Sequence, residues 1–218
     1  MTHPIIKDLL WRRTTKQYDS TKKVSESDLK ILFEAMQLSA SSINSQPWKF
    51  IVIESNEAKQ RLHQTFAENY QFNQKHAFDS SQVILFAHKT HYSREDYAKV
   101  VDQGIKDKRT KPENRESAFG GFLFAEMTMD ENGNNSAWTK AQTYLALGNT
   151  LHTLARLRVD ATPLEGIDSK RIKEAFKNEL DGYQCDVALA IGYKLADKDF
   201  NANLPKSRLA LEETLIRI

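Results

Sequence analysis

Three short, almost uninterrupted apolar runs most strongly limit what this chain can fold into. They are "KFIVIE" (49–54), "QVILFAH" (82–88) and "CDVALAIGY" (185–193), each rich in Val, Ile or Ala and flanked by polar residues. Runs of this length and composition predict β-strands. Because their apolar residues do not alternate with polar ones, both faces of the resulting sheet should be covered by helices.

Helical periodicity in the rest of the chain supplies the covering helices. Ser25 is a candidate N-cap for a helix over 25–38, in which apolar residues recur every three or four positions. Further amphipathic helices are predicted over 57–69, 94–107 and 169–179. Strands and helices that mix in this way along one chain predict an α+β fold.

The longest predicted helix covers residues 136–158 and is apolar on more than one side. Such a helix either runs through the core or lies in a subunit interface. Gly148 lies inside it, where glycine costs roughly 1 kcal/mol relative to alanine. We therefore expect a close packing contact at Gly148.

The chain has 218 residues, enough for one domain with a sizeable core. Repeats and linkers are lacking, so we expect a single domain over residues 1–218. The stretch 105–136 is long, charged and interrupted by glycines around an apolar "FGGFLF". A long irregular segment of this kind predicts a lid-like excursion from the domain.

Charge and cysteine content exclude several classes of function. The net charge is only +2, and Lys and Arg are spread along the chain rather than gathered in the basic stripe of a nucleic-acid-binding protein. The single cysteine, Cys185, allows no internal disulfide and lies in an apolar run, as an inert core thiol does. The sequence shows neither a signal peptide nor a membrane-spanning run. We expect a cytoplasmic protein that binds neither nucleic acid nor membrane.

Common catalytic and metal-binding motifs are missing. The chain contains no GxGxxG, no GxxxxGK[ST] and no GxSxG, which argues against the glycine-rich phosphate loops and the serine nucleophile elbow. Its six histidines are scattered. The nearest pair, His88 and His91, has no carboxylate or cysteine close by in the sequence, so no metal site is predicted.

Four polar clusters remain as candidate sites. Taken singly, they read as a solvated helix end, a capping loop, a turn and a charged tail. Together they place four cations, Arg12, Lys16, Lys206 and Arg208, in two clusters without neighbouring carboxylates, as a bound phosphate or anionic cofactor requires. The clusters are "LWRRTTKQYD" (10–19), "SASSINSQPW" (39–48), "PLEG" (163–166) and "LPKSRL" (204–209).

These segments, in this order, resemble the oxygen-insensitive nitroreductase family, the FMN-dependent NAD(P)H nitroreductases and dihydropteridine reductases of bacteria. The resemblance extends over essentially the whole chain and includes "NYQFNQKH" (69–76) and "VVDQ" (100–103). It implies a nitroreductase-like fold with a central, mainly antiparallel sheet covered by helices. It also implies a homodimer with a domain-swapped C-terminal tail and two FMN molecules at the interface, each contacted by both chains.

The resemblance assigns the phosphate end of FMN to the two cation clusters. Arg12, Thr14 and Lys16 would lie on its phosphate, ribityl and pyrimidine side, and Lys206 and Arg208 would close on the phosphate. Arg13 stands where relatives often have histidine and is expected to make a similar contact.

The flavin ring is assigned to three other segments. Asn73 would meet the isoalloxazine edge, and the "PLEG" turn with Pro163 would bring the backbone of Glu165 and Gly166 beside the reactive flavin nitrogen. Gly166 permits this close backbone approach. The residues that would reach the partner's flavin are Ala40, Ser41, Ser42 and Asn44.

Aromatic residues are assigned to the substrate side. Tyr70, Phe72 and Phe124 would line the exposed face of the flavin, and Phe124 would reach over the partner's flavin. Alternatively, the "FGGFLF" that contains Phe124 only pins the long excursion as a hydrophobic staple. His76 stands where relatives often have lysine, and a neutral imidazole attracts electrons toward the flavin less than an ammonium does.

The implied enzyme is an oxidoreductase in which NADH or NADPH reduces FMN and a nitroaromatic or quinone then enters the same pocket, which predicts ping-pong kinetics. No protein side chain is assigned a catalytic role, because the flavin carries the chemistry. An alternative is a dihydropteridine or flavin reductase with incidental nitroreductase activity. Two rivals stay open: a basic module that binds anionic surfaces, and a flavoprotein that only regulates.

Overall fold

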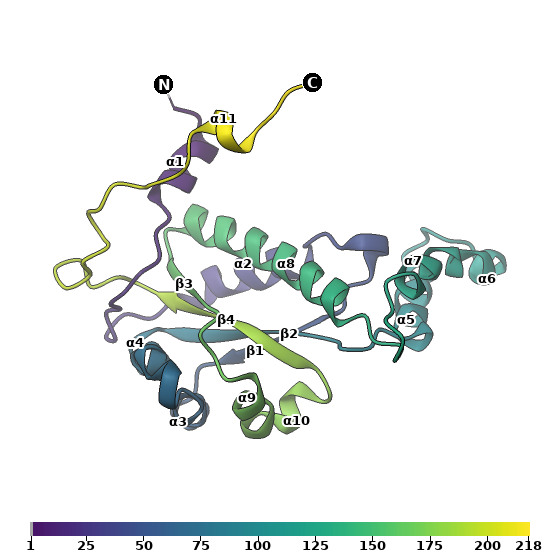
Figure 1. Cartoon of the computed structure of the whole chain (residues 1–218), viewed down its shortest axis with the longest axis horizontal. Coiled ribbons are helices and arrows are strands. Elements are labelled where there is room, and N and C mark those ends of the chain that lie inside the picture. Colours follow the sequence, from purple (N-terminus) through teal and green to yellow (C-terminus); the bar gives the residue numbers. More distant parts are fainter. Residues whose placement is uncertain (1) are drawn as a thin grey trace.

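The computed structural model describes residues 2–218 and is built on one four-stranded antiparallel sheet (Figure 1). Its strands are β1 (Trp48–Ile53), β2 (Gln82–His88), β3 (Asp160–Leu164) and β4 (Gln184–Gly192), in the order β1-β2-β4-β3. The three apolar runs are thus confirmed as strands. A fourth strand, β3, runs into the first two residues of "PLEG" and pairs with β4 at the edge of the sheet.

Strand β2 shows why these runs are almost continuously apolar. Val83 and Leu85 face one hydrophobic cluster, whereas Ile84 and Phe86 face the other, and all four are fully buried. A strand with both faces in a core needs an apolar residue at every position, even in an antiparallel sheet. The register of β2 with β4 shifts between Phe86 and Ala87.

Helices cover both faces of the sheet (Figure 1). None of the helices in residues 2–218 is long and apolar enough to cross a membrane. On one face lie α2 (Glu26–Gln37) and α8 (Ser136–Leu157); on the other lie α3 (Asn56–Thr65), α4 (Gln74–Asp79), α9 (Ser169–Ala175) and α10 (Lys177–Leu180).

The predicted helices are present, with two interruptions. The helix expected over 57–69 ends at Thr65, and Glu68, which has a left-handed backbone (φ 51°), begins the 3-10 segment η2 (Glu68–Asn73). The helix expected over 169–179 divides at Phe176, whose φ of −121° is not helical. Its N-cap is Asp168, which accepts from two backbone N–H groups.

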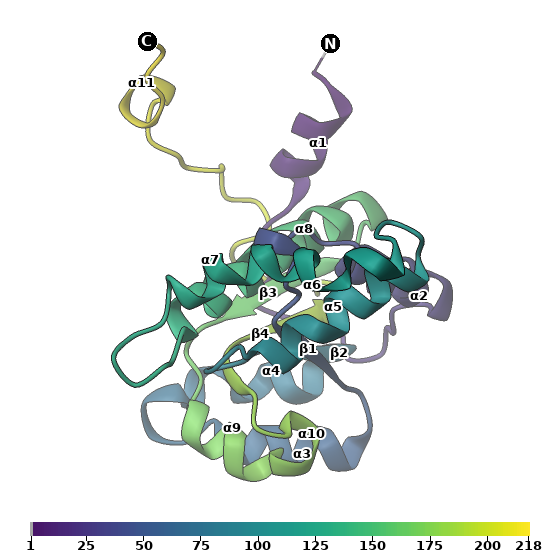
Figure 2. The ribbon, with the colours of Figure 1, turned by 90° about the vertical axis from the view of Figure 1, so that its right-hand side faces the viewer.

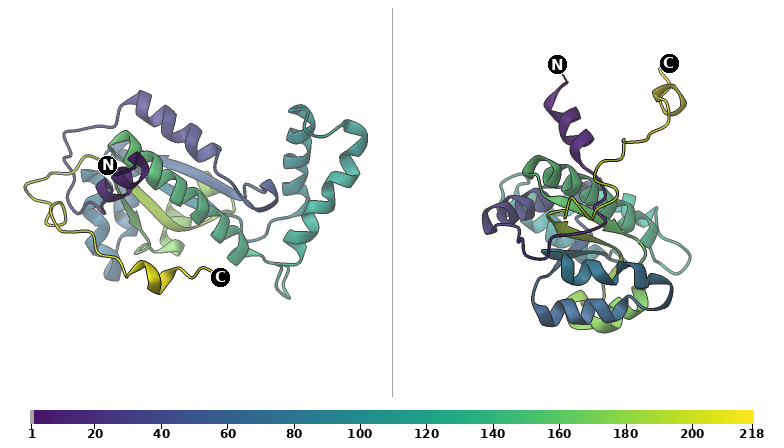
Figure 3. Two further views of the ribbon diagram at one scale, coloured as in Figure 1. Left: turned by 90° about the horizontal axis from the view of Figure 1, so that it is seen from above. Right: turned by 90° about the vertical axis from the view of Figure 1, so that its left-hand side faces the viewer.

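The excursion is helical, which corrects the expectation of an irregular segment. Residues 105–136 follow the predicted helix α5 (Arg94–Lys106) and contain α6 (Arg115–Ala118) and α7 (Phe122–Glu126). With α5 they extend from one end of the sheet (Figures 1 and 3). Phe119 and Phe122 of the "FGGFLF" are buried in a cluster separate from those beneath the sheet faces. These two residues act as the hydrophobic staple, whereas Phe124 is 47% exposed.

Both ends of the chain form arms that leave the body on the same side, well separated from each other (Figures 2 and 3). The N-terminal arm, α1 (Pro4–Trp11), is fixed by its buried Asp8, which pairs with Arg158 at 2.7 Å and Arg156 at 3.4 Å. The C-terminal arm contains α11 (Leu211–Thr214). Exposed apolar residues on the arms are Ile5, Ile6, Leu9, Leu10, Leu209, Leu211, Leu215, Ile216 and Ile218.

The outward face of α8 does not contain the close contact expected at Gly148. Gly148 is exposed, and a Cβ there would meet no atom of residues 2–218 within 4 Å apart from its chain neighbours and the nearby backbone of its own helix. One turn earlier, the side chain of Leu145 is 57% exposed. The expectation of close packing at Gly148 is therefore wrong within a single chain, and the surface of α8 around Leu145 and Gly148 stays uncovered.

Cys185 is the inert core thiol that the sequence predicts. It is buried in β4, and its Sγ lies 3.4 Å from the carbonyl oxygen of Val187. Burial raises the pKa of the Cys185 thiol to about 12, so the thiolate is not formed near neutral pH.

Candidate functional site

Residues from four distant segments meet in a pocket of about 310 Å³ beside the end of β3. Larger cavities of about 410 and 450 Å³ lie under α1 and beside α5. The smaller pocket is the candidate site because the predicted residues converge there. It is lined by Lys16, Phe72, Asn73, Lys75, His76, Thr162, Pro163, Leu164, Glu165, Gly166 and Phe200.

The "PLEG" turn is closely packed on one side and has unpaired donors on the other. The side-chain amide of Asn73 donates to the carbonyl of Gly166 at 2.8 Å. A Cβ at Gly166 would lie 2.7 Å from Cζ of Phe72 and 3.0 Å from Nδ2 of Asn73, so only glycine fits without a shift. Within residues 2–218, the backbone N–H groups of Glu165 and Gly166 find no acceptor.

His76 is buried in the wall of this pocket. Its ring meets that of Tyr18 edge-on, with centroids 5.7 Å apart and an interplanar angle of 86°. Burial, with the added effect of the nearby Lys75 and Lys16 ammonium groups, lowers the pKa of His76 to about 4. The imidazole is therefore neutral at physiological pH.

The two cation clusters, far apart in sequence, come together. The Lys206 ammonium donates to the carbonyl oxygen of Arg12, across 194 residues. Burial and the nearby Arg208 guanidinium lower the pKa of Arg12. The pKa of Lys206 is also lowered, first by burial and then by the positive charges of Arg12, Arg208 and Arg13. Among residues 2–218, no carboxylate forms an ion pair with any cation of these two clusters.

Two residues that the sequence reasoning missed hold these segments together. The carboxylate of Asp199 accepts from the backbone N–H of Lys16 at 3.0 Å, and Nδ2 of Asn201 donates to the carbonyl of Thr14 at 2.7 Å. Thr14 also forms a parallel bridge with Ala161 of β3. Both missed residues precede "LPKSRL" by only a few positions, which is the one sequence signal that could have identified them.

The "SASSINSQPW" loop lies away from this pocket. The backbone N–H of Ser42 donates to Oε1 of Gln142 on α8 at 2.8 Å. Ile43 and Asn44 both have left-handed backbones, with φ of 52° and 56°. Ala40, Ser41, Ser42 and Asn44 are therefore held in a fixed loop that does not reach the pocket of their own chain.

The three aromatic residues assigned to substrate are not together in one chain. Phe72 lines the pocket, whereas Tyr70 packs against the cluster beneath the sheet. Phe124 lies on the excursion, 6.3 Å from Trp138 between ring centroids. Of the three, only Phe72 lines the pocket of its own chain, and the expectation that Phe124 reaches the partner's flavin stays a prediction.

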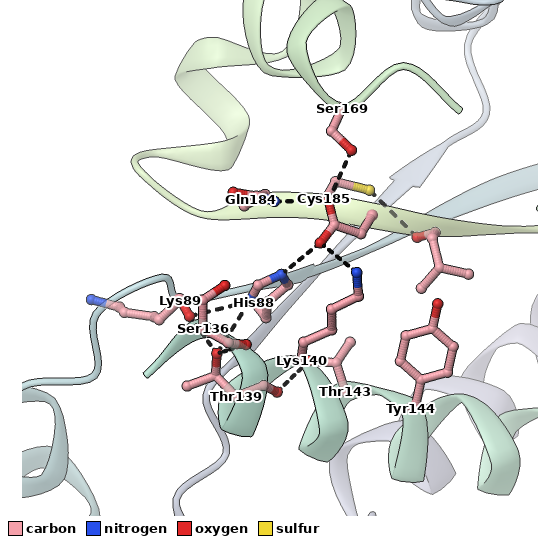
Figure 4. A network of polar contacts seen from close by, with 12 residues as sticks. His88, Lys89, Ser136, Thr139, Lys140, Thr143, Tyr144, Ser169, Gln184 and Cys185 are labelled. Carbon is pink, nitrogen blue, oxygen red and sulfur yellow. Dashed lines mark hydrogen bonds and ion pairs between the residues drawn. The ribbon is translucent and has the colours of Figure 1, made fainter. Parts of the chain in front are cut away.

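A polar network that the sequence analysis did not predict joins strands β2 and β4 to helices α8 and α9 (Figure 4). His88, predicted to have no carboxylate companion, pairs with Asp186 of β4 at 3.1 Å. The same carboxylate accepts from Lys140 of α8 at 3.0 Å and from Ser169 of α9 at 2.8 Å. The hydrogen bond from His88, with those from Gln184, Lys140 and Ser169, holds the pKa of Asp186 far below its usual range. Asp186 thus ties helices from both layers to the sheet.

Near the pocket, the hydroxyl of Tyr144 on α8 donates to the carboxylate of Glu165. Burial first, and then Glu165, raises the pKa of Tyr144. Among residues 2–218, no group of three or more His, Cys, Asp and Glu residues is placed to hold a metal ion. The site therefore offers cations, amide donors and a neutral imidazole.

Comparison with solved structures identifies the fold. A protein of Exiguobacterium sibiricum solved in complex with FMN matches with a TM-score of 0.82 and 22% identity, over 100% of this chain and 99% of that one. A nitroreductase family protein of Streptococcus pneumoniae matches with a TM-score of 0.75 and 19% identity, over 98% and 99%. At these identities the likeness shows the fold, which is the nitroreductase fold that the resemblance implied.

Sequence comparison identifies the family. The chain is 59% identical over 215 residues to the major NAD(P)H-flavin oxidoreductase of Aliivibrio fischeri, covering 99% of each chain. It is 36% identical over 216 residues to the oxygen-insensitive NAD(P)H nitroreductase of Salmonella typhimurium, covering 98% of this chain and 99% of the relative. The sequence model of the nitroreductase family matches residues 9–193 of this chain. The chain therefore belongs to the nitroreductase family.

Proposed function

We propose that this protein is an FMN-dependent NAD(P)H oxidoreductase that reduces small aromatic substrates such as nitroaromatics and quinones. When bound, FMN supplies the hydride chemistry, so the protein needs to bind and orient rather than to provide a catalytic acid or base. The names of its relatives support this proposal, since they are an NAD(P)H-flavin oxidoreductase and an NAD(P)H nitroreductase.

The observation that carries the proposal is the convergence of two cation clusters that form no ion pair with a carboxylate in the described part of the chain, residues 2–218. Lys206 meets the Arg12 backbone, and Arg208 lies near enough to lower the pKa of Arg12. Cations held this close repel one another unless an anion lies between them. The phosphate of FMN is such an anion, because ammonium and guanidinium groups bind its oxygens through charge-assisted hydrogen bonds. The residues present therefore fit the cofactor.

The pocket next to these cations suits the flavin ring. The unpaired N–H groups of Glu165 and Gly166 can donate to ring atoms, and Asn73 fixes the turn that carries them. Lys16 lines the same pocket and belongs to the N-terminal cation cluster, so it can bridge the two ends of the cofactor. Phe72 provides an apolar surface beside the ring.

We further propose that the active form is a homodimer with FMN at its interface. The uncovered face of α8 and the two apolar arms provide surfaces that a second copy can bury. In such a dimer, the loop with Ser41, Ser42 and Asn44 would reach the partner's flavin, as would Phe124. This arrangement accounts for assigned residues that lie outside the pocket of their own chain.

The flavin absorbance of the purified protein tests the proposal. We expect a yellow protein with about one FMN per chain, bleached by NADH or NADPH. Lys16→Ala and Arg208→Ala should each purify with much less flavin, whereas Lys198→Ala, which removes an exposed cation of the same tail, should keep it. A colourless wild type with salt-sensitive binding to nucleic acid would favour the basic-module alternative, and full flavin content in both variants would show that the phosphate is placed wrongly.

A second candidate is reduction of free flavin or dihydropteridine, with nitroreduction incidental. The 59% identity to a flavin oxidoreductase favours it over the 36% identity to a nitroreductase. Values of kcat/KM for menadione, a nitrofuran, free FMN and a dihydropteridine would distinguish the two. We expect the highest value to identify the substrate class, and equally poor values for all four would contradict the enzyme proposal.

A further inference from the structure

We propose that His76 is an uncharged N–H donor in the pocket wall, which offers the flavin a hydrogen bond without adding a third positive charge to those of Lys16 and Lys75. The inference rests on the proposed flavin site. It makes His76 a residue that sets the electron affinity of the bound cofactor.

The backbone around His76 is fixed at both ends of α4. At the N-terminal end, Asn73 is bonded to the Gly166 carbonyl. At the C-terminal end, the hydroxyl of Ser80 donates to the His76 carbonyl, and the buried ammonium of Lys59 donates to the Ser80 carbonyl at 2.8 Å. His76 therefore keeps its place in the pocket wall.

The orientation of the imidazole is also fixed. Tyr18 meets the ring edge-on and is itself held in place: its hydroxyl donates to the carbonyl of Ala190 at 2.9 Å and lies 3.1 Å from Oγ1 of Thr162. His76 is 4% exposed, so its ring has little room to turn. The imidazole nitrogens thus point in set directions.

The two nitrogens have different surroundings. Nδ1 of His76 is fully enclosed and has no hydrogen-bond partner among residues 2–218. A buried N–H without an acceptor is rarer than a buried acceptor without a donor. The proton is therefore expected on Nε2, which also has no protein partner, so that Nε2–H is the group left to donate to a ligand in the pocket.

The charges around the ring keep it neutral. Lys16 and Lys75 lower the pKa of His76, and the Asp199 carboxylate, the one anion that raises it, accepts from the Lys16 backbone instead. Tyr18, on the remaining side, is an uncharged phenol whose pKa burial raises. A neutral N–H donor suits a carbonyl oxygen of the flavin ring, and it stabilises the reduced anionic ring less than a permanent ammonium would.

The test combines NMR with potentiometry on the holoprotein. Protein labelled with ¹⁵N-histidine gives the tautomer and pKa of His76 from long-range ¹H–¹⁵N spectra, with the signal assigned by its loss in His76→Gln. We expect the Nε2–H tautomer and a pKa below 5. A Nδ1–H tautomer, or a pKa of 6 or higher, would overturn the inference.

The flavin potential gives a second, independent readout. Glutamine keeps an N–H donor without charge, so His76→Gln should change the equilibrium between oxidised and reduced flavin less than threefold. His76→Lys should shift that equilibrium tenfold or more toward the reduced form, and His91→Gln, at an exposed loop position, should leave it unchanged. Equal potentials for wild type and His76→Lys would overturn the inference. If the protein binds no flavin, the proposed function fails, while the NMR measurement still decides the state of His76.

Discussion

The exposed glycine on α8 offers the sharpest test of how this chain assembles. In a lone chain, Gly148→Ala adds a methyl group into open space, since no atom lies within 4 Å of the new Cβ. Alanine also favours the helix by about 1 kcal/mol relative to glycine. If the chain acts alone, the substitution should therefore stabilise it.

A dimer that buries this face reverses the expectation. An added methyl group in a packed interface costs about 1–3 kcal/mol, and a two-fold symmetric dimer meets it twice, so the loss is roughly 2–6 kcal/mol of association free energy. The helix-propensity gain applies equally to free and associated chains and does not offset this loss. We expect the dimer dissociation constant of Gly148→Ala to rise at least tenfold, since tenfold corresponds to about 1.4 kcal/mol.

Sedimentation equilibrium and thermal unfolding together provide the assay. Gly104→Ala in α5 is the matched control, because a Cβ there would meet only Oγ1 of Thr110 at an ordinary 3.9 Å. The control should gain thermal stability and keep the dissociation constant of the wild type. If Gly148→Ala behaves like the control in both measurements, the outward face of α8 is solvated and the proposed interface is wrong.

Two further predictions concern the network and the turn. Asp186→Asn should lower the free energy of unfolding at pH 7 by about 2 kcal/mol, as expected for lost hydrogen bonds to a charged group. Because the pKa of Asp186 is depressed in the folded state, this difference from wild type should shrink as the pH falls below about 4, the pKa of the unfolded state. Denaturant titrations from pH 3 to 7 would measure it, and a pH-independent difference would contradict the prediction. Gly166→Ala should push Phe72 aside and weaken the Asn73 hydrogen bond, and so lower the flavin-to-protein absorbance ratio of the purified protein. Gly120→Ala is the control, because a Cβ at that exposed position contacts no other part of residues 2–218 within 4 Å. Equal ratios in the two variants would refute the role of the turn.

Much of the fold could be predicted because its central strands are buried on both faces. β2 is apolar at nearly every position, a pattern that no surface strand shows. β3 was harder to predict, since "DATPL" contains an acid and a proline and is defined mainly by its pairing with β4. Proline is tolerated there because β3 is an edge strand.

In the candidate site, the charged residues that meet could be predicted from the sequence, whereas the residues that hold their segments in place could not. Lys16 and Lys206 stand out in sequence because no carboxylate neighbours them. Asp199 and Asn201 do not, because each acts on a backbone group more than 180 residues away, and no periodicity or motif marks such contacts. Gly148 is the opposite case: the sequence predicted close packing there, but within the described chain nothing packs against it.

The separate core of the helical excursion bears on how such a protein diversifies. Tyr97, Phe119 and Phe122 pack with one another and not with the clusters on either side of the sheet. We therefore expect substitutions on the outer surface of this segment to disturb the sheet and the cation clusters little, although Phe124 itself contacts Trp138 of α8. In the proposed enzyme, the surface around Phe124 can therefore change its substrate contacts while the residues proposed to bind the anion stay the same, so a new substrate preference need not cost folding stability.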